Sequence, residues 1–311
     1  MKPDIVVMGP IYAPTLSQLD AICTVHRLWE APDKNAFLAD LCGRVDTAVT
    51  SGGRGMTAEE MRALPALKLI ACFGVGVDAI DVDSATAFGI KVTNTPDVLT
   101  EDVADLALAL LLATVRRVAA GDRFVRDGLW LKGAMPLTQS LQNKTLGIIG
   151  MGRIGHAIAK RAQAFGMQIA YQGPRRKPEP YAYFADPVEL ARHCDVLLAA
   201  CPGGEATRGL VSVAVIEALG PEGVFVNIAR GSVVDEAALV DALVQGRLGG
   251  AGLDVFADEP RVPDALVELD QVVLQPHVGS ATFATRQAMG QLVIDNVAAW
   301  FAKKPLVTPV N

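Results

Sequence analysis

The stretch that most constrains this chain is an apolar run, Thr145–Ile149, followed at once by Gly150, Gly152 and Gly155 in the spacing Gly-x-Gly-x-x-Gly. An Ala-rich segment of helical character, residues 156–165, comes next. In a strand–turn–helix setting the first glycine permits a tight turn, the second lets the backbone approach a pyrophosphate, and the third lets helix and strand pack closely. Phosphates then bind the free amides at the helix N-terminus. A plain glycine-rich turn is the alternative, but the flanking strand and helix favour dinucleotide binding.

The composition is that of a globular protein with room for two domains. The chain has 311 residues, of which 51% are hydrophobic and 20% charged. The net charge of −6 and the absence of a long Lys/Arg run argue against nucleic-acid partners. The most apolar stretch, Val103–Val115, is interrupted by Asp105 and is too short to span a bilayer, so no membrane association is expected. The segment Met1–Met8 resembles a buried strand more than a signal peptide, which predicts a cytoplasmic location.

The five cysteines show no CxxC spacing and mostly lie in apolar runs, which predicts buried free thiols in a reducing compartment and no metal site. They are Cys23, Cys42, Cys72, Cys194 and Cys201.

Short apolar runs alternate with helical segments along the whole chain. Strands are predicted at Ile5–Met8, Thr24–Leu28, Thr47–Thr50, Leu67–Cys72, Lys91–Thr93, Gln168–Gln172, Asp195–Ala200, Gly223–Ile228, Gly252–Val255 and Gln271–Leu274. Helices are predicted at Leu16–Ile22, Lys34–Leu41, Ala58–Ala63, Glu101–Ala120, Pro187–His193, Val213–Leu219, Glu236–Gln245 and Ala281–Lys303. Near-continuous apolar strands between helices imply parallel sheets covered on both faces.

The predicted fold class is therefore α/β, with two Rossmann-like or flavodoxin-like parallel-sheet domains and an active-site cleft between them. The turn at Asn94–Asp97 is the expected domain crossing. A discontinuous substrate-binding domain is predicted at residues 1–98 and 286–311, and a dinucleotide-binding domain at residues 99–285.

The long helix predicted at Glu101–Ala120 has Thr100 as its expected N-cap. It is apolar on most sides through Leu106–Leu112, so we expect it to be buried, with another subunit as one possible partner. Residues 124–140, which include Trp130, carry aromatic side chains but little regular pattern. We expect a loop there that packs on a partner.

The residues after the second strand of the dinucleotide unit indicate which cofactor binds. An NAD site places an acid there for the ribose hydroxyl, but this strand ends at Gln172 and is followed by Gly-Pro-Arg175-Arg176-Lys177. A carboxylate would repel a 2′-phosphate, whereas guanidinium groups bind it through charge-assisted hydrogen bonds. An ordinary exposed basic loop is the alternative. The pattern favours NADPH as the cofactor, with NADH still possible.

Three polar residues stand at or just after predicted strands: Arg230, Glu259 and His277. Parallel strands end on one edge of a sheet, so these side chains can converge near the cofactor. Hydride transfer to a carbonyl leaves an alkoxide, for which a histidine is a suitable proton donor. Glu259 would orient the imidazole, and Arg230 would bind the substrate carboxylate and polarise the carbonyl. Each of the three also has an ordinary structural interpretation.

A second glycine-rich turn, Gly74–Asp78, follows a strand of the first domain. Its backbone amides could bind the other oxygen of a substrate carboxylate, although a mere turn is an equal alternative.

From Leu69 to Thr285 the chain strongly resembles the D-2-hydroxyacid dehydrogenase family. The motifs that carry the resemblance are Phe73–Asp78, Gly150–Gly155, Asn227–Ser232, Gly252–Phe256 with Asp258–Pro260, and Pro276–Thr282. The resemblance implies that Arg230, Glu259 and His277 are catalytic, and that Val75, Gly76, Arg230 and His277 bind substrate. It implies a cofactor site made of Thr100, Gly150, Gly152, Arg153, Ile154, Gly155, Arg175, Arg176, Lys177, Cys201, Pro202, Thr207, Ile228, Ala229, Asp254, His277 and Gly279, with Asp254 near the nicotinamide carboxamide.

Within the family the chain looks most like glyoxylate/hydroxypyruvate reductases and hydroxyphenylpyruvate reductases, because of the basic segment at 175–177 and the segment Cys201–Thr207. The expected reaction is NADPH-dependent reduction of glyoxylate or hydroxypyruvate to the (R)-2-hydroxy acid. Arylpyruvate reduction and a nucleotide-sensing, corepressor-like binding protein are the alternatives. A serine hydrolase using Ser232 lacks the Gly-x-Ser-x-Gly elbow. The resemblance also implies a homodimer built through the cofactor domain.

Overall fold

The computed structural model describes residues 2–311 and divides into two compact units. Unit 1 comprises Met1–Leu99 and Ser280–Asn311, and unit 2 comprises Thr100–Gly279. The second crossing therefore falls at 279–280, earlier in the chain than the position 285–286 chosen from the sequence. Each unit is a parallel sheet with helices on its faces, which is the α/β class predicted from the apolar strand pattern.

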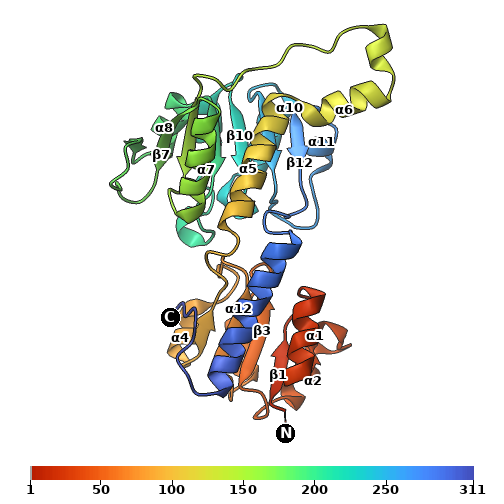
Figure 1. Ribbon diagram of the computed structural model, residues 1–311, viewed down its shortest axis with the longest axis vertical. Helices are drawn as coiled ribbons and strands as arrows, with labels where there is room; N and C mark the ends of the chain where they lie inside the picture. The colour runs from red at the N-terminus through yellow and green to blue at the C-terminus, as the bar shows by residue number, and fades with distance from the viewer. Residues whose placement is uncertain (1) are drawn as a thin grey trace. The chain divides into compact units, whose positions relative to one another are not determined.

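Unit 1 contains a five-stranded parallel sheet in the order β2-β1-β3-β4-β5. Its strands are β1 (Asp4–Val7), β2 (Thr24–Arg27), β3 (Thr47–Ser51), β4 (Leu69–Phe73) and β5 (Lys91–Thr93). Its helices are α1 (Ala13–Ile22), α2 (Lys34–Asp40), α3 (Ala58–Ala63), α4 (Val82–Ala87) and α12 (Phe283–Phe301), with a 3-10 turn η1 (Leu28–Glu30). The returning helix α12 lies beside α1 and over β4 (Figure 1).

Unit 2 contains a seven-stranded parallel sheet in the order β12-β11-β10-β9-β6-β7-β8. Its strands are β6 (Thr145–Ile149), β7 (Gln168–Gln172), β8 (Ala182–Phe184), β9 (Val196–Ala199), β10 (Val224–Asn227), β11 (Gly250–Leu253) and β12 (Val272–Leu274). Its helices are α5 (Thr100–Val115), α6 (Val118–Arg126), α7 (Arg153–Ala164), α8 (Pro187–His193), α9 (Val213–Leu219), α10 (Glu236–Val244) and α11 (Asp264–Val267). Short 3-10 turns are η2 (Leu129–Lys132), η3 (Glu205–Thr207) and η4 (Gly231–Val233).

The strand order places β6 next to both β7 and β9, so the chain moves out from β6 in one direction and then returns to build the sheet in the other. This reversal is the position at which open α/β sheets bind ligands. Helices α5 and α7 pack together on one face of this sheet (Figure 1).

The single long helix expected at residues 101–120 is wrong. Arg117 has a left-handed backbone, with φ of 49°, and it separates α5 from α6. The buried residues of α5 pack on β10, β11 and α7 of the same unit. The buried part of α5 is therefore covered within the chain, whereas Ala109 is exposed and Leu106 and Leu112 are only partly buried.

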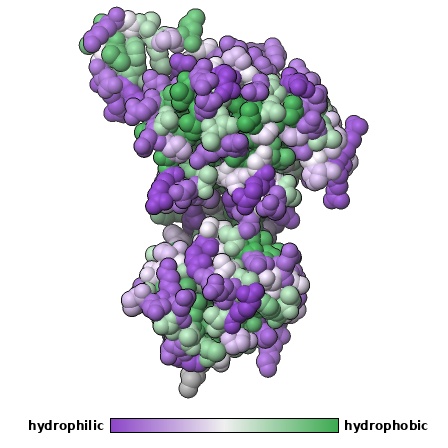
Figure 2. Space-filling view, turned by 180° about the vertical axis from the view of Figure 1, so that it is seen from behind, coloured by the Kyte–Doolittle hydropathy of each residue, from purple (hydrophilic) through white to green (hydrophobic). Residues whose placement is uncertain are grey.

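Residues 124–140 were expected to be irregular, but they begin with the end of α6 and the turn η2. Residues 118–140, which include all of α6 and η2 and which we call the arm, extend away from the sheet of unit 2 in Figure 1. Trp130 is 69% exposed, Leu131 93% and Leu137 99%. Figure 2 shows the resulting apolar surface among polar groups on this segment.

Sequence patterns missed three short elements, which are β8, α4 and α11. The cysteines are free as expected, but Cys42 is exposed, whereas the other four are buried. Burial raises the pKa of Cys23 and Cys201 to about 11 and that of Cys194 to about 12, so these three thiols stay protonated. No helix within residues 2–311 is long and apolar enough to cross a membrane.

Candidate active site

The strands of unit 2 end level with one another. Ile149 of β6 is in register with Gln172 of β7 and Ala199 of β9. Ala199 is in register with Asn227 of β10, which is in register with Leu253 of β11. The loops that follow these residues therefore leave the sheet along one edge, and they contain most of the candidate cofactor residues and all three candidate catalytic residues.

The three glycines after β6 are required for three different reasons. Gly150 has φ of 97°, and a Cβ there would lie 2.7 Å from backbone atoms of Cys201. A Cβ on Gly155 would lie 2.3 Å from the Gly150 carbonyl oxygen, so a side chain would push α7 off the turn. Gly152 is different: no heavy atom among the described residues lies within 4 Å of its Cβ position. The backbone at Gly152 is thus open to an approaching ligand, as a pyrophosphate requires.

Gly152 is also the N-cap of α7, and no side chain of the described residues caps this helix. The backbone amides at the start of such a helix form a site that favours an anion. The open glycine and the uncapped helix together fit the diphosphate of a dinucleotide.

The basic loop after β7 (residues 173–180) is held against the glycine turn. The Lys177 amide donates to the Tyr171 hydroxyl at 2.8 Å, and the Lys177 ammonium donates to the Met151 carbonyl at 2.5 Å. Arg175 and Arg176 are exposed. The Gln172 side chain donates to the Ala185 carbonyl at 3.3 Å. At the end of β7, where an NAD site has an acid, this chain therefore has a neutral amide that is hydrogen-bonded to the backbone.

The other candidate cofactor residues follow neighbouring strands or begin α5. Thr100 was expected to be the N-cap of α5, but it is the first residue of that helix. Cys201 and Pro202 follow β9, where the Thr207 hydroxyl donates to the Pro202 carbonyl at 2.7 Å. Ile228 and Ala229 follow β10, and Asp254 and Gly279 follow β11 and β12.

The turn that carries Arg230 is organised by a buried asparagine. The Asn227 side-chain amide donates to the Arg230 carbonyl at 3.0 Å, and its oxygen accepts from the Ala229 amide at 3.0 Å. A Cβ on Gly231 would lie 2.0 Å from the Phe256 backbone, so only glycine lets this turn approach the segment that bears Glu259. The close approach brings the Arg230 charge near the Glu259 carboxylate.

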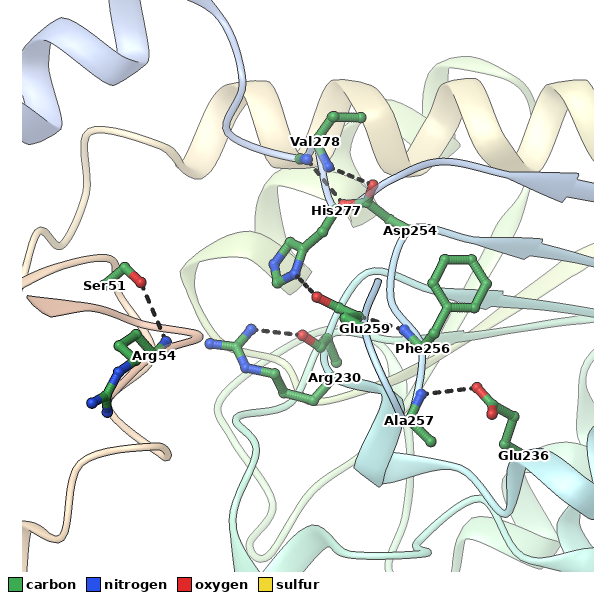
Figure 3. A network of polar contacts seen from close by, with 12 residues as sticks. Ser51, Arg54, Arg230, Glu236, Asp254, Phe256, Ala257, Glu259, His277 and Val278 are labelled. Atoms are coloured by element: carbon green, nitrogen blue, oxygen red, sulfur yellow. Dashed lines mark hydrogen bonds and ion pairs between the residues drawn. The ribbon is translucent and has the colours of Figure 1, made fainter. Parts of the chain in front are cut away.

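Glu259 pairs with His277. The distance from His277 Nδ1 to Glu259 Oε2 is 2.8 Å, and Glu259 Oε1 accepts from the Phe256 amide at 3.1 Å. Because a carboxylate only accepts hydrogen bonds, Nδ1 carries the proton and Nε2 is left for a substrate. Figure 3 shows the Arg230 and His277 side chains pointing the same way, beyond Glu259.

The pKa of Glu259 is held below its ordinary value. Burial alone would raise it, but the hydrogen bond and charge of His277, the Phe256 amide and the Arg230 charge together outweigh burial. Glu259 is thus an anion at neutral pH.

The loop bearing His277 is fixed by Asp254, which is 2% exposed. The Asp254 carbonyl accepts from the His277 amide at 2.9 Å, and its carboxylate accepts from the amides of Val278 at 2.7 Å and Gly279 at 2.9 Å. These bonds hold His277 in a left-handed backbone with φ of 53°. Burial raises the pKa of Asp254, and the two amides only partly offset it.

Sequence reasoning missed these supporting roles of Asn227, Gly231 and Asp254. The one available signal was a polar residue at the end of an apolar strand, as at Asn227 in Val-Phe-Val-Asn. Val75 and Gly76 belong to unit 1, where the Asn94 side chain donates to the Val75 carbonyl at 2.8 Å and the Thr95 amide to the Gly74 carbonyl at 2.9 Å. These two hydrogen bonds fix the backbone of the turn after β4.

Comparison with known proteins agrees with this architecture. Residues 108–279 match the family model described as D-isomer specific 2-hydroxyacid dehydrogenase, NAD binding domain. The chain is 47% identical to hydroxyphenylpyruvate reductase of Plectranthus scutellarioides and 46% identical to a glyoxylate/hydroxypyruvate reductase of Arabidopsis thaliana, in each case over 98% of both chains. The chain belongs to the D-isomer specific 2-hydroxyacid dehydrogenase family.

Solved structures show the same relationship. The NADPH-dependent glyoxylate/hydroxypyruvate reductase from Sinorhizobium meliloti, in complex with NADP and malonate, superposes with a TM-score of 0.93 at 45% identity, over 100% of this chain and 97% of that one. A 2-hydroxyacid dehydrogenase from Ketogulonicigenium vulgare gives 0.92 at 45% identity, over 100% and 99%. The protein is thus an oxidoreductase with a domain for a nicotinamide dinucleotide.

Proposed function

We propose that this enzyme reduces a small 2-oxo acid with NADPH, either glyoxylate to glycolate or hydroxypyruvate to (R)-glycerate. The observation that carries the proposal is the His277–Glu259 pair beside Arg230, on the same sheet edge as the open glycine turn. Bound NADPH supplies the hydride. The similarity to glyoxylate/hydroxypyruvate reductases supports the substrate class.

In this mechanism Arg230 binds the substrate carboxylate and polarises the carbonyl with its fork of donors. His277 Nε2 gives its proton to the carbonyl oxygen as the alkoxide forms, and the anionic Glu259 stabilises the imidazolium before that transfer. We assign the backbone amides of Val75 and Gly76 to the second carboxylate oxygen. Asp254 keeps His277 in place throughout, since its carboxylate accepts from the amides of Val278 and Gly279, the two residues that follow His277.

The preference for NADPH rests on the basic loop. Arg175 and Arg176 are exposed next to the end of β7, and residues 172–177 include no carboxylate that would repel a 2′-phosphate. A 2′-phosphate bound by guanidinium groups should improve kcat/KM for NADPH over NADH by roughly tenfold or more. Equal kcat/KM values for the two cofactors, or a higher value for NADH, would contradict the proposed preference for NADPH.

The test of the substrate class is a screen of NADPH oxidation with glyoxylate, hydroxypyruvate, pyruvate and phenylpyruvates. We expect glyoxylate and hydroxypyruvate to give the highest kcat/KM. Arylpyruvate reduction is the second candidate, which the 47% identity to a hydroxyphenylpyruvate reductase supports. A higher kcat/KM for hydroxyphenylpyruvate than for glyoxylate and hydroxypyruvate would favour arylpyruvate reduction as the function.

We also propose that the chain forms a homodimer through unit 2. The arm exposes Trp130, Leu131 and Leu137, and an apolar surface of this kind is typical of an interface. Light scattering should give twice the chain mass of 32.8 kDa, and a double Leu131→Ser, Leu137→Ser variant should give the monomer mass. A monomeric unaltered protein would contradict the proposal.

A further inference from the structure

A second histidine–carboxylate pair lies at the cofactor end of unit 2. His156 is in the first turns of α7, and its Nδ1 lies 2.7 Å from the carbonyl oxygen of Gly152. Its Nε2 lies 2.6 Å from Oε1 of Glu179, in the basic loop. The side chains of His156 and Glu179 are 41% and 20% exposed, so the pair is partly shielded from water.

The contacts of His156 define its charge. A carbonyl oxygen can only accept a hydrogen bond, and an ionised carboxylate can only accept one. Both ring nitrogens therefore have to donate, which only the imidazolium does. The hydrogen bond to Glu179 raises the pKa of His156, burial opposes the shift, and the Gly152 carbonyl adds to it.

The pair connects the two parts of the proposed 2′-phosphate site. The basic loop is tied near its middle by Lys177, to the Tyr171 hydroxyl and the Met151 carbonyl. Glu179 ties the far side of the loop to His156, which itself holds Gly152. Arg175 and Arg176 lie between these ties and the end of β7, so the path of the backbone through 177–179 determines where the two guanidinium groups can reach.

We propose that His156 and Glu179 are positioning residues that hold the basic loop over the glycine turn and so set the enzyme's preference for a 2′-phosphorylated cofactor, in a pH-dependent way. The proposal rests on the proposed NADPH preference. Neither residue touches the reacting atoms, so hydride transfer itself should be little affected.

The surroundings of His156 give the sign of the pH effect. Glu179 and Lys177 face it from the basic loop, with Glu179 favouring and Lys177 opposing its charge. On its own helix the nearest charged residues are Arg153 and Lys160, while Glu101 and Asp105 of the packed helix α5 are engaged by Arg161. As pH rises through the raised pKa, the ring loses a proton and keeps only one of its two hydrogen bonds. The loop is then released, and NADPH affinity falls.

The test measures dissociation constants of NADPH and NADH by fluorescence titration from pH 7 to pH 9. His156→Gln and Glu179→Gln should weaken NADPH binding by roughly tenfold at pH 7, the value expected for one charge-assisted hydrogen bond, and should change NADH binding far less. His156→Arg restores a permanent cation, so it should retain the preference and lose the pH dependence. The matched control is His26→Gln, because His26 makes the same 2.6 Å contact with Asp4 in unit 1.

The outcomes separate the two proposals. An unaltered enzyme that binds NADPH no better than NADH overturns the proposed cofactor preference and this inference with it. An unaltered enzyme that prefers NADPH, together with His156→Gln and Glu179→Gln variants that keep that preference at every pH, overturns the inference alone. A loss of preference in His156→Gln that His156→Arg rescues, with the His26→Gln control unchanged, supports it.

Discussion

Nδ1 of His277 lies 2.8 Å from Oε2 of Glu259, and this contact decides which nitrogen of the ring can serve a substrate. The carboxylate fixes the proton on Nδ1, so Nε2 is the atom that can donate to a carbonyl oxygen. The backbone of the same histidine is fixed separately, through Asp254. Orientation of the ring and placement of the loop thus depend on different residues, and substitutions can separate them.

His277→Ala should lower kcat for 2-oxo acid reduction by about 10²–10⁴-fold, because the alkoxide loses its positioned proton donor. NADPH binding should be nearly unchanged. Steady-state kinetics and a cofactor titration measure both quantities, with His26→Ala in unit 1 as the control. Turnover close to normal would show that another group supplies the proton.

Glu259→Gln tests the ion pair through its effect on stability. The pKa of Glu259 is lower in the folded protein, so the pair stabilises the fold above the ordinary glutamate pKa of about 4.3 and ceases to do so as pH falls through the lower folded value. The difference in Tm between the unaltered protein and the variant should therefore be constant near neutral pH and shrink in acid. Glu268→Gln, at an exposed position, is the control. A difference that grows in acid would contradict the assigned pair.

Asp254→Asn should reduce both stability and activity. An asparagine has one acceptor oxygen for the two amides of Val278 and Gly279, and its amino group would face an amide hydrogen. We expect a loss of about 1–3 kcal/mol in the free energy of unfolding, together with a lower kcat, since His277 would lose its fixed backbone. Chemical denaturation and kinetics measure these. Asp258→Asn is the control, since that side chain is 71% exposed; an equal effect in both variants would argue against the role.

The glycines of the turn should separate binding from folding. Gly152→Ala places its methyl group in open space, so Tm should barely change while the dissociation constant for NADPH rises by roughly tenfold or more, because the methyl group occupies the approach to the backbone. Gly155→Ala should lower Tm, since its methyl group would meet the Gly150 carbonyl. Gly53→Ala, also in open space but in unit 1, is the control. Unchanged NADPH binding in Gly152→Ala would exclude that glycine from the cofactor site.

The sequence was informative where chemistry depends on residues at strand ends. Arg230, Glu259 and His277 follow buried apolar runs, and parallel strands bring such positions to one edge. The glycine spacing likewise predicted the tight turn found at Gly150 and the close helix packing found at Gly155, while the position of Gly152 is open. Both patterns depend on residues that are close together in the chain, so they can be recognised from the sequence alone.

Contacts that depend on side-chain direction were not readable in this way. Glu179 is 23 positions from His156, and nothing in either neighbourhood indicates the pairing. The break at Arg117 is a single left-handed residue inside an otherwise helical pattern, so periodicity alone extended the helix through it. Asp254 was assigned to the cofactor by resemblance, and its hydrogen bonds to the His277 loop appear only in three dimensions.

The most direct measurement is stoichiometric: hydroxypyruvate is reduced with a known amount of NADPH, and the product is resolved by chiral chromatography. The proposed function predicts one (R)-glycerate formed for each NADPH oxidised, and no product from the His277→Ala variant on the same timescale. Formation of the (S)-enantiomer, or no 2-oxo acid-dependent oxidation of bound NADPH, would contradict it.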